Sequence, residues 1–351
     1  MSLRSVAATN LVLRVGVMAI VGGALIVSLT NGSFVRAQRS QIARRPNLRL
    51  PDEASGIDAI AQALIAVFDQ VDIVALGEVH LRGVDSELRI ALIRHPDFAK
   101  KVRTIVIECG SIAEQSKLDR YIRGENVPKA ELERVWKATR NGPNGMCDSP
   151  FYTDFLAAAR EVNSALPPDA RICVLGGESG AASMGRGNST TSVMREPVLH
   201  RRGKALLIYG AAHFYLDAPA DYRASMGENI PLAAALDLEY PGRWLSVIRI
   251  DAFDRPSAVK EKDIDPDYQK LDRALKTQVR PVLVPLQRIP FRDFTAEEFL
   301  GRTLTTCRGA GGCRSVFKGS TLTLGQMADA CVYVGRRDAD TLIQAKPSKF
   351  E

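Results

Sequence analysis

The chain has 351 residues, of which 46% are hydrophobic and 25% are charged, proportions that are ordinary for a globular protein and too apolar for a disordered one. Its 27 glycines and 18 prolines exclude collagen-like and low-complexity chains. The formal charge of +7 is only weakly basic, and no dense run of Lys and Arg with interleaved aromatic residues is present. We therefore expect no nucleic-acid partner.

The first 37 residues have the pattern of a secretory signal peptide. Arg4 and Arg14 precede an uncharged run from Val15 to Leu29, which is short for a membrane-spanning helix of about 20 residues. Val35 and Ala37 stand at the −3 and −1 positions of a cleavage site before Gln38. We predict export to the periplasm or the medium. The alternative is an uncleaved signal that anchors the chain, and this segment would then be its only contact with a membrane.

After a basic, proline-marked linker over residues 38–54, the sequence alternates between helical periodicity and short apolar runs. The first helix is expected from Ile57 to Phe68. Further helical stretches are expected over Asp85–Ile93 and through Asp119, Trp136 and Phe155. The expected strands are Val71–Gly77, Arg103–Cys109, Arg171–Gly176, Ala205–Gly210, Trp244–Ile250 and Pro281–Pro285.

This alternation predicts an α/β fold, with a largely parallel central sheet that is covered by helices on both faces. We expect residues 55–351 to form a single domain, in which 291–351 can form a small appendage. The stretches Gly180–Thr191 and Asp251–Asp267 are expected to be exposed loops, because they are rich in small residues or in scattered charges and prolines.

The six cysteines are interpreted in the light of the predicted export, because disulfides persist in oxidising compartments. Cys307 and Cys313 flank a flexible Arg-Gly-Ala-Gly-Gly segment, so we predict a bridge between them. Cys109 and Cys173 lie in or just after apolar runs, which favours small, buried and inert thiols. The pairing of Cys109, Cys147, Cys173 and Cys331 stays open.

Two of the four histidines occur in one repeated pattern, Gly-x-x-His, directly after a predicted strand. The first is Gly77-Glu-Val-His80 and the second is Gly210-Ala-Ala-His213. Glu108 closes another strand, and Glu178 follows a fourth. Ligands of open parallel sheets bind outside the carboxyl ends of the strands, so these side chains are expected to converge there. A glycine at the strand exit permits a sharp turn with positive φ, or a close approach to the backbone.

Two imidazoles and one or two carboxylates suit two kinds of chemistry. They are common ligands of a divalent metal with an open position, which lowers the pKa of bound water and polarises a carbonyl. Without a metal, a carboxylate beside an imidazole makes an acid–base pair. The candidate metal ligands are His80, His213, Glu78, Glu108 and Glu178. His95 and His200 lie in helical or helix-end stretches, and we interpret them as surface or capping residues.

Several segments resemble one protein superfamily. Val-Ala-Leu-Gly-Glu-Val-His80, Thr-Ile-Val-Ile-Glu-Cys-Gly110 and the neighbouring stretches up to Arg123 resemble the erythromycin esterase-like, ChaN-like and Tiki superfamily. Ala-Leu-Leu-Ile-Tyr-Gly-Ala-Ala-His213 is similar to its second histidine motif. Tyr240–Trp244 and Met327–Gly335 are similar to late segments of bacterial members.

The resemblance implies that Glu78, His80, Glu108 and His213 form an active or metal-binding cleft. Glu178 matches an acid that follows the middle strand in that superfamily. Arg186 matches the arginine of an Arg-Asp pair in esterase-like members, although Gly187 stands in place of the acid.

Members of this superfamily differ in chemistry, and the fold does not choose among them. Some hydrolyse a lactone ester, Tiki-like members are metal-dependent proteases, and ChaN-like members bind haem. Haem binding would need an axial ligand, for which Tyr209 and Tyr215 are candidates, although packing roles are equally open to them.

The leading hypothesis is an exported hydrolase-like protein that activates water against an ester or amide of a small-molecule or peptide substrate. His80 would be its general base or a metal ligand. The alternatives are a non-catalytic haem- or metal-binding protein of the cell envelope, and a structural envelope protein that keeps the site as a relic.

Overall fold

The computed structural model describes residues 48–140, 142, 146–147, 150–179, 185–219, 222, 231–252, 266–300, 305–307, 313–315 and 317–336. The signal peptide predicted over 1–37 and most of the predicted linker lie outside these ranges. Among the described helices, none is long and apolar enough to cross a membrane.

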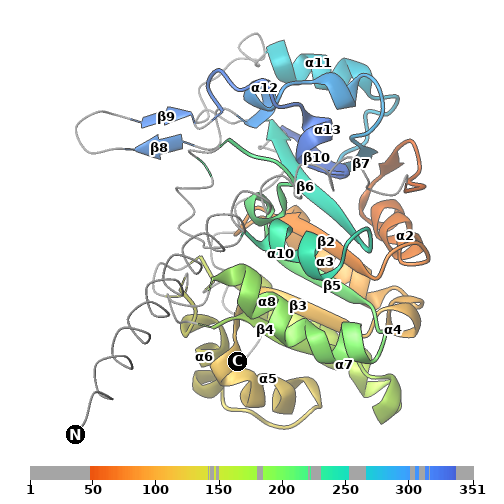
Figure 1. The fold of residues 1–351 in the computed structure, drawn as a ribbon. Coiled ribbons are helices and arrows are strands. Elements are labelled where there is room, and N and C mark those ends of the chain that lie inside the picture. The colour runs from red at the N-terminus through yellow and green to blue at the C-terminus, as the bar shows by residue number, and fades with distance from the viewer. Residues whose placement is uncertain are drawn as a thin grey trace, which may run out of the picture. The chain divides into compact units, whose positions relative to one another are not determined.

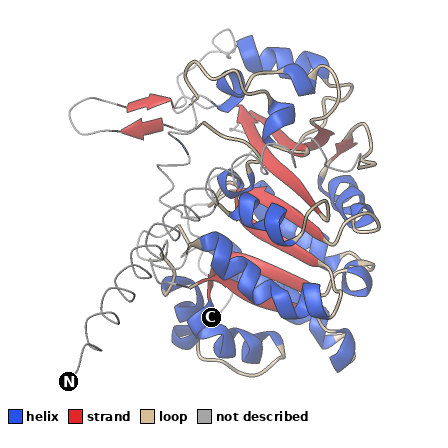
Figure 2. Cartoon of the chain, viewed as in Figure 1, coloured by secondary structure: helices blue, strands red, loops and turns tan. Residues whose placement is uncertain are grey.

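An eight-stranded sheet runs through the molecule, with helices on both sides (Figures 1 and 2). Its strand order is β1-β7-β10-β6-β2-β5-β3-β4. All neighbours from β10 to β4 are parallel, whereas β7 pairs antiparallel with both β10 and β1. The strands are β1 (Ala54–Ser55), β2 (Ile73–Glu78), β3 (Thr104–Ser111), β4 (Cys173–Glu178), β5 (Ala205–Gly210), β6 (Trp244–Ala252), β7 (Val282–Pro285) and β10 (Ala330–Arg336).

The expected α/β class is thus confirmed, and each of the six expected strands is present. The run Ala205–Gly210 coincides with β5, and it is almost wholly apolar because a parallel strand is buried on both faces. β5 lies between β2 and β3, and all three are fully buried along nearly their whole length.

Three apolar clusters fill the space between sheet and helices. The largest lies between β2, β3 and β5 on one side and the helices that follow β1, β2 and β3 on the other. These helices are α2 (Ile57–Val67), α3 (Gly83–Arg94), α4 (Phe98–Lys101), α5 (Gln115–Ile122), α6 (Lys129–Lys137) and α7 (Pro150–Ser164), with the 3₁₀ turns η1 (Ile112–Glu114) and η2 (Pro168–Ala170).

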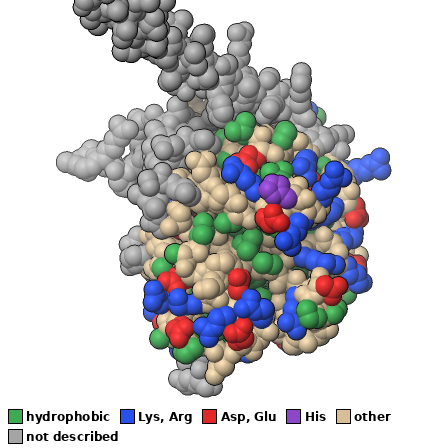
Figure 3. Space-filling view, turned by 60° about the horizontal axis from the view of Figure 1, so that its bottom comes forward, with side chains coloured by type: hydrophobic (Ala, Val, Ile, Leu, Met, Phe, Trp, Pro, Cys, Tyr) green, Lys and Arg blue, Asp and Glu red, His purple; other side chains and the backbone are tan. Residues whose placement is uncertain are grey.

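A second cluster packs the opposite face of the same strands, and a third covers β6, β7 and β10. The second involves α8 (Arg186–Met194), the π-helical turn η3 (Arg195–His200), the 3₁₀ turn η4 (Ala211–Phe214) and α10 (Leu232–Glu239). The third involves α11 (Pro266–Ala274), η6 (Phe291–Asp293), α12 (Ala296–Leu300) and α13 (Leu324–Met327). Basic and acidic side chains are interspersed on the face drawn in Figure 3.

Two expectations about the later chain are wrong. β10 pairs with both β6 and β7 inside the main sheet, so this part of 291–351 is not an appendage. The expected loop Gly180–Thr191 contains the first turns of α8, while its residues 180–184 lie outside the described part. Ser189 and Thr190 are fully buried, and their hydroxyls are satisfied there by hydrogen bonds with Gly177 O and the Tyr209 hydroxyl.

The cysteines also differ from expectation. Cys109 is buried but is not a free thiol, because it forms a disulfide with Cys147. Cys173 is free and exposed at the start of β4, so the expected burial is wrong, and Cys331 is free and buried. Cys307 and Cys313 are directly opposite each other in the two-stranded sheet of β8 (Thr305–Cys307) and β9 (Cys313–Ser315). Their side chains lie outside the described part, so that bridge stays a prediction.

Candidate functional site

The two Gly-x-x-His motifs meet at the carboxyl ends of neighbouring strands. His80 lies two residues beyond the end of β2, and His213 lies in η4, directly after β5. Glu78 is the last residue of β2, and Glu108 lies near the end of β3, on the other side of β5. The chain crosses from β2 toward β3 on one side and from β5 toward β6 on the other. The motifs therefore sit where the connections diverge, the usual place for a site in such sheets.

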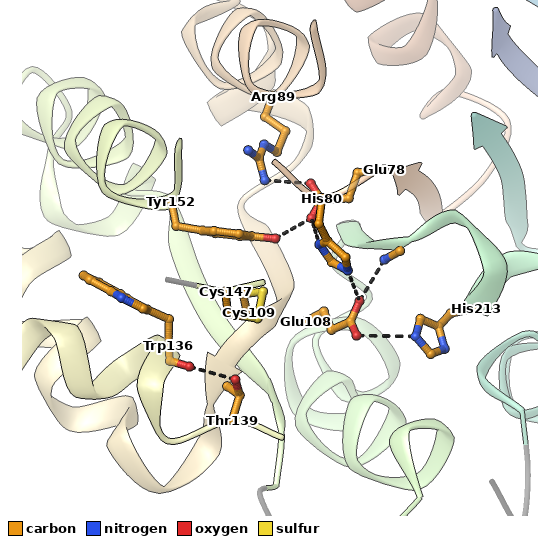
Figure 4. Close-up of a disulfide and its surroundings, with 11 residues drawn as sticks. Glu78, His80, Arg89, Glu108, Cys109, Trp136, Thr139, Cys147, Tyr152 and His213 are labelled. Carbon is orange, nitrogen blue, oxygen red and sulfur yellow. Dashed lines mark hydrogen bonds and ion pairs between the residues drawn. A yellow bond between two sulfur atoms is a disulfide. The ribbon is translucent and has the colours of Figure 1, made fainter. Parts of the chain in front are cut away.

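His80 lies between two carboxylates that come from opposite faces of the sheet (Figure 4). Glu78 follows Val74 and Leu76 by two-residue steps and shares their face, which α3 and α7 cover. Glu108 follows Val106, which packs on the other face. His80 Nδ1 is 3.0 Å from Glu78 Oε1, and His80 Nε2 is 3.6 Å from Glu108 Oε2. The other oxygen of Glu108 is 3.4 Å from His213 Nε2.

Glu78 is held as an ion although it is buried. Burial alone would raise its pKa, but the Arg89 guanidinium 2.7 Å from Oε2 and the hydrogen bonds from His80 and Tyr152 outweigh that effect. The pKa of Glu78 falls from 4.5 to about 2. An ionised carboxylate only accepts hydrogen bonds, so His80 Nδ1 must carry a proton and donate it to Glu78.

The two neighbouring carboxylates also change the proton affinity of His80. Burial alone would lower its pKa, but the hydrogen bond to Glu78 and the charges of Glu78 and Glu108 raise it above 6.5, against an opposing effect of Arg89. Because Nδ1 is occupied by Glu78, the proton that titrates is the one on Nε2. This nitrogen is therefore the basic atom of the site.

The two glycines of the motifs act by close packing and not by positive φ, which corrects the expectation. Gly210 has φ of −51°, and a Cβ on it would lie 3.3 Å from His80 Nε2. The second motif thus leaves room for the histidine of the first. The Gly210 backbone N–H also donates to Glu108 Oε2 at 2.8 Å, which fixes that carboxylate beside His80.

Gly77→Ala is expected to lower the free energy of unfolding by about 1–3 kcal/mol, the usual cost of overpacking. The new Cβ would lie 2.7 Å from Ala211 Cα and 2.9 Å from Val247 O, and backbone atoms cannot move aside as a side chain can. Urea denaturation measures this loss, with Gly210→Ala as the comparison because its Cβ meets only side chains. Equal stability of Gly77→Ala and the wild type would contradict the packing role.

The residue after His80 has an unusual backbone. Leu81 has φ of +66°, in the left-handed region that non-glycine residues rarely adopt. Such strain costs of the order of 1–3 kcal/mol and clusters at functional sites. Leu81 is also an exposed apolar side chain directly beside the basic histidine.

Other expected site residues lie apart from these four. Glu178 ends β4, the strand beyond β3, is buried, and pairs with Arg140 at 3.2 Å. Arg186 is the first residue of α8, and its side chain lies outside the described part. The expected roles of these two residues stay predictions.

The two candidate haem ligands are core residues. The Tyr209 hydroxyl is 2.6 Å from Thr190 Oγ1, and its ring packs edge-on against His213. Tyr215 packs against Tyr222 and Phe317, and burial raises its pKa well above the usual value. Haem binding stays a prediction.

Two residues that hold Glu78 were not expected from the sequence. Arg89 comes from α3 and Tyr152 from α7, and the guanidinium lies over the Tyr152 ring, 4.8 Å from its centroid. The sequence pattern identifies both only as parts of helices. A buried arginine needs an acidic partner, but neither residue is close in sequence to Glu78. A second buried ion pair, Asp85 of α3 with Arg249 of β6, also joins residues that the sequence pattern does not connect.

The expected metal ligands do not all fit a metal. Both oxygens of Glu78 are engaged by Arg89, Tyr152 and His80, and Glu178 is paired with Arg140. Within the described ranges, no group of three or more His, Cys, Asp or Glu side chains is arranged to hold a metal ion. A divalent metal stays a sequence prediction, for which chelation is the test.

No protein-family model matches this chain, and no curated protein matches its sequence. Among solved structures, it is similar to an erythromycin esterase variant in its open conformation, with 13% identity and a TM-score of 0.49 over 80% of this chain and 94% of that one. A Bacillus cereus protein gives 11% identity and a TM-score of 0.49 over 86% and 97% of the two chains. A succinoglycan biosynthesis protein gives 9% identity and a TM-score of 0.48, over 85% of this chain and 97% of that one.

These three likenesses are to solved structures that share little sequence with this chain. With every identity below 15% and every TM-score below 0.5, they carry no argument about chemistry. The chemistry of the site is argued from this chain's own residues.

Proposed function

We propose that this protein is an exported hydrolase in which His80 is the general base that activates water against an ester or amide. The observation that carries the proposal is the hydrogen bond between buried Glu78 and partly buried His80, in which an ionised carboxylate fixes the imidazole through Nδ1 and leaves Nε2 as the base. A carboxylate that orients a histidine in this way also stabilises the imidazolium that forms during catalysis.

The proposed reaction needs only groups that the site holds. His80 Nε2 takes a proton from water as the water oxygen bonds the carbonyl carbon. The C–O or C–N bond then breaks, and the leaving group takes the proton back from Nε2, which completes the hydrolysis. Glu108 and His213 lie on the Nε2 side of the imidazole and are placed to contact the reacting water or the leaving group.

Two features support export. The N-terminal pattern is that of a signal peptide, and the Cys109–Cys147 disulfide is of a kind that persists in oxidising compartments. The proposed substrate is a small molecule or a peptide, and Leu81 is exposed beside His80.

Turnover is expected to rise with pH through an apparent pKa above 6.5. The pKa of His80 is raised, so Nε2 is protonated and inactive at lower pH and becomes a base only above that value. The measurement is kcat/KM between about pH 5 and 9 on a panel of esters, lactones and peptides. A profile that falls over this range would contradict a base of raised pKa.

The control for this profile is the same protein after treatment with a chelator and removal of bound metal. We expect unchanged turnover. Loss of turnover, restored by a divalent metal, would assign the activation of water to the metal in place of His80.

A further inference from the structure

The disulfide lies directly beside the site. Cys109 follows Glu108 in β3, and Cys147 lies three residues before α7 begins at Pro150. The bridge therefore joins the strand that carries Glu108 to the start of the helix that carries Tyr152 (Figure 4). Both cysteines are buried, at 1% and 0% exposure, so the bridge is shielded from reductants in the folded protein.

At the other end of this connection, Tyr152 holds Glu78. Its hydroxyl donates to Glu78 Oε1, the same oxygen that accepts the His80 Nδ1–H. Arg89 lies over the Tyr152 ring and bonds the second oxygen. Tyr152 and Arg89 together thus hold the carboxylate that orients His80.

The Gly210 N–H of β5 holds Glu108 Oε2, but the backbone pairing of the strands does not by itself set the spacing of the two carboxylates. β5 separates β2 from β3, and the pairing of β3 with β5 runs from Thr104 to Ile107. Glu108 lies one residue beyond this ladder. The disulfide from Cys109 to Cys147, three residues before α7, and the hydrogen bond from Tyr152 to Glu78 complete a ring of contacts that includes His80 and that the backbone ladder does not provide.

We propose that the Cys109–Cys147 disulfide and Tyr152 act together as a positioning brace that holds Glu78 and Glu108 on either side of His80. The importance of the brace for turnover rests on the proposed function. The brace itself is a matter of geometry and can be tested without a substrate.

The experiment follows the imidazole Nδ1–H of His80 by proton NMR. The chain has four histidines, and loss of the signal in His80→Gln assigns it. We expect Tyr152→Phe and Cys109→Val/Cys147→Ala each to move this resonance and to speed its exchange with water about fivefold or more, as loss of a hydrogen bond allows. In the variant that carries all three substitutions, the Nδ1–H should exchange no faster than in whichever of the two variants exchanges faster. Both variants break the same connection between Glu108 and Glu78.

Cys173→Ala and Tyr240→Phe are the matched controls. Cys173 is a free, exposed cysteine at the opposite end of its strand, and Tyr240 is a buried tyrosine away from Glu78. Both should leave the signal unchanged. A wild-type signal in the disulfide variant would overturn the brace. So would a combined variant in which the exchange rate rises by the product of the two separate increases.

If the disulfide variant is too unstable to study by NMR, a second measurement tests the brace in the wild-type protein. Amide exchange of α7, followed by mass spectrometry in the wild type, should show the turns after its first protected from exchange, and less protected after reduction in mild denaturant. Equal protection of α7 before and after reduction would overturn the proposal. Neither measurement depends on hydrolysis, so failure of the proposed function would appear separately, as turnover that persists in His80→Gln.

Discussion

His80→Gln is expected to lower kcat by about 10²- to 10⁴-fold, the range that a positioned general base contributes. Glutamine has nearly the volume of histidine and can still donate to Glu78, but its amide has no basic nitrogen at the place of Nε2. The stability of the variant should therefore stay close to that of the wild type. Steady-state turnover and urea denaturation of the same preparation separate loss of chemistry from loss of fold.

His200→Gln is a matched control for this substitution. His200 Nδ1 is 2.9 Å from Glu196 Oε2, so it also forms a histidine–glutamate pair, but both side chains are exposed on η3. This variant should keep full turnover. If His80→Gln kept turnover as well, the assignment of His80 as the base would be wrong.

Arg89→Met is expected to lower the free energy of unfolding by about 3–5 kcal/mol, the usual cost of leaving one partner of a buried ion pair alone. Methionine keeps most of the length and packing of arginine but removes the charge that offsets the burial of Glu78. Chemical denaturation near neutral pH measures the loss. The double variant Glu78→Gln/Arg89→Met should regain part of it, because no unpaired charge is then buried.

Arg94→Met is the matched control on the same helix. Arg94 and Glu161 are also 2.7 Å apart, but their side chains are 55% and 67% exposed, so the pair contributes less than about 1 kcal/mol. A loss in Arg89→Met as small as that in Arg94→Met would contradict the role given to burial.

The cost of Arg89→Met should also depend on pH. The pKa of Glu78 is about 2 in the folded protein against 4.5 ordinarily, so its stabilising contribution is complete above pH 4.5 and is lost as the pH falls toward 2. The difference in stability between the wild type and Arg89→Met should therefore shrink over that interval.

The four residues at the centre of the site could be predicted because each is tied to a strand end. Glu78, His80, Glu108 and His213 occur within three residues of an apolar run, and parallel strands bring their carboxyl ends to one edge. The order of the strands could not be predicted. Non-local pairing places β5 between β2 and β3, and this position lets Gly210 make room for His80.

The residues that support the site could not be predicted, because helical periodicity places them on apolar faces without naming their partners. Arg89 and Tyr152 reach Glu78 from two different helices, at separations of 11 and 74 residues. The disulfide partner of Cys109 could not be predicted for the same reason. The composition of the small polar residues in α8 is typical of a loop, so the sequence predicts a loop there, whereas their burial depends on contacts with β4 and β5.

The local pattern of this chain was enough to predict an α/β fold, six of its strands and a histidine after each of two strand ends, because apolar periodicity and strand-end glycines are encoded within a few residues of one another. The ion pair that keeps Glu78 charged, the proton affinity of His80 and the disulfide beside Glu108 arise only in the folded chain. They depend on distances and burial between segments far apart in sequence, and a buried charge takes its chemistry from the neighbours that folding provides.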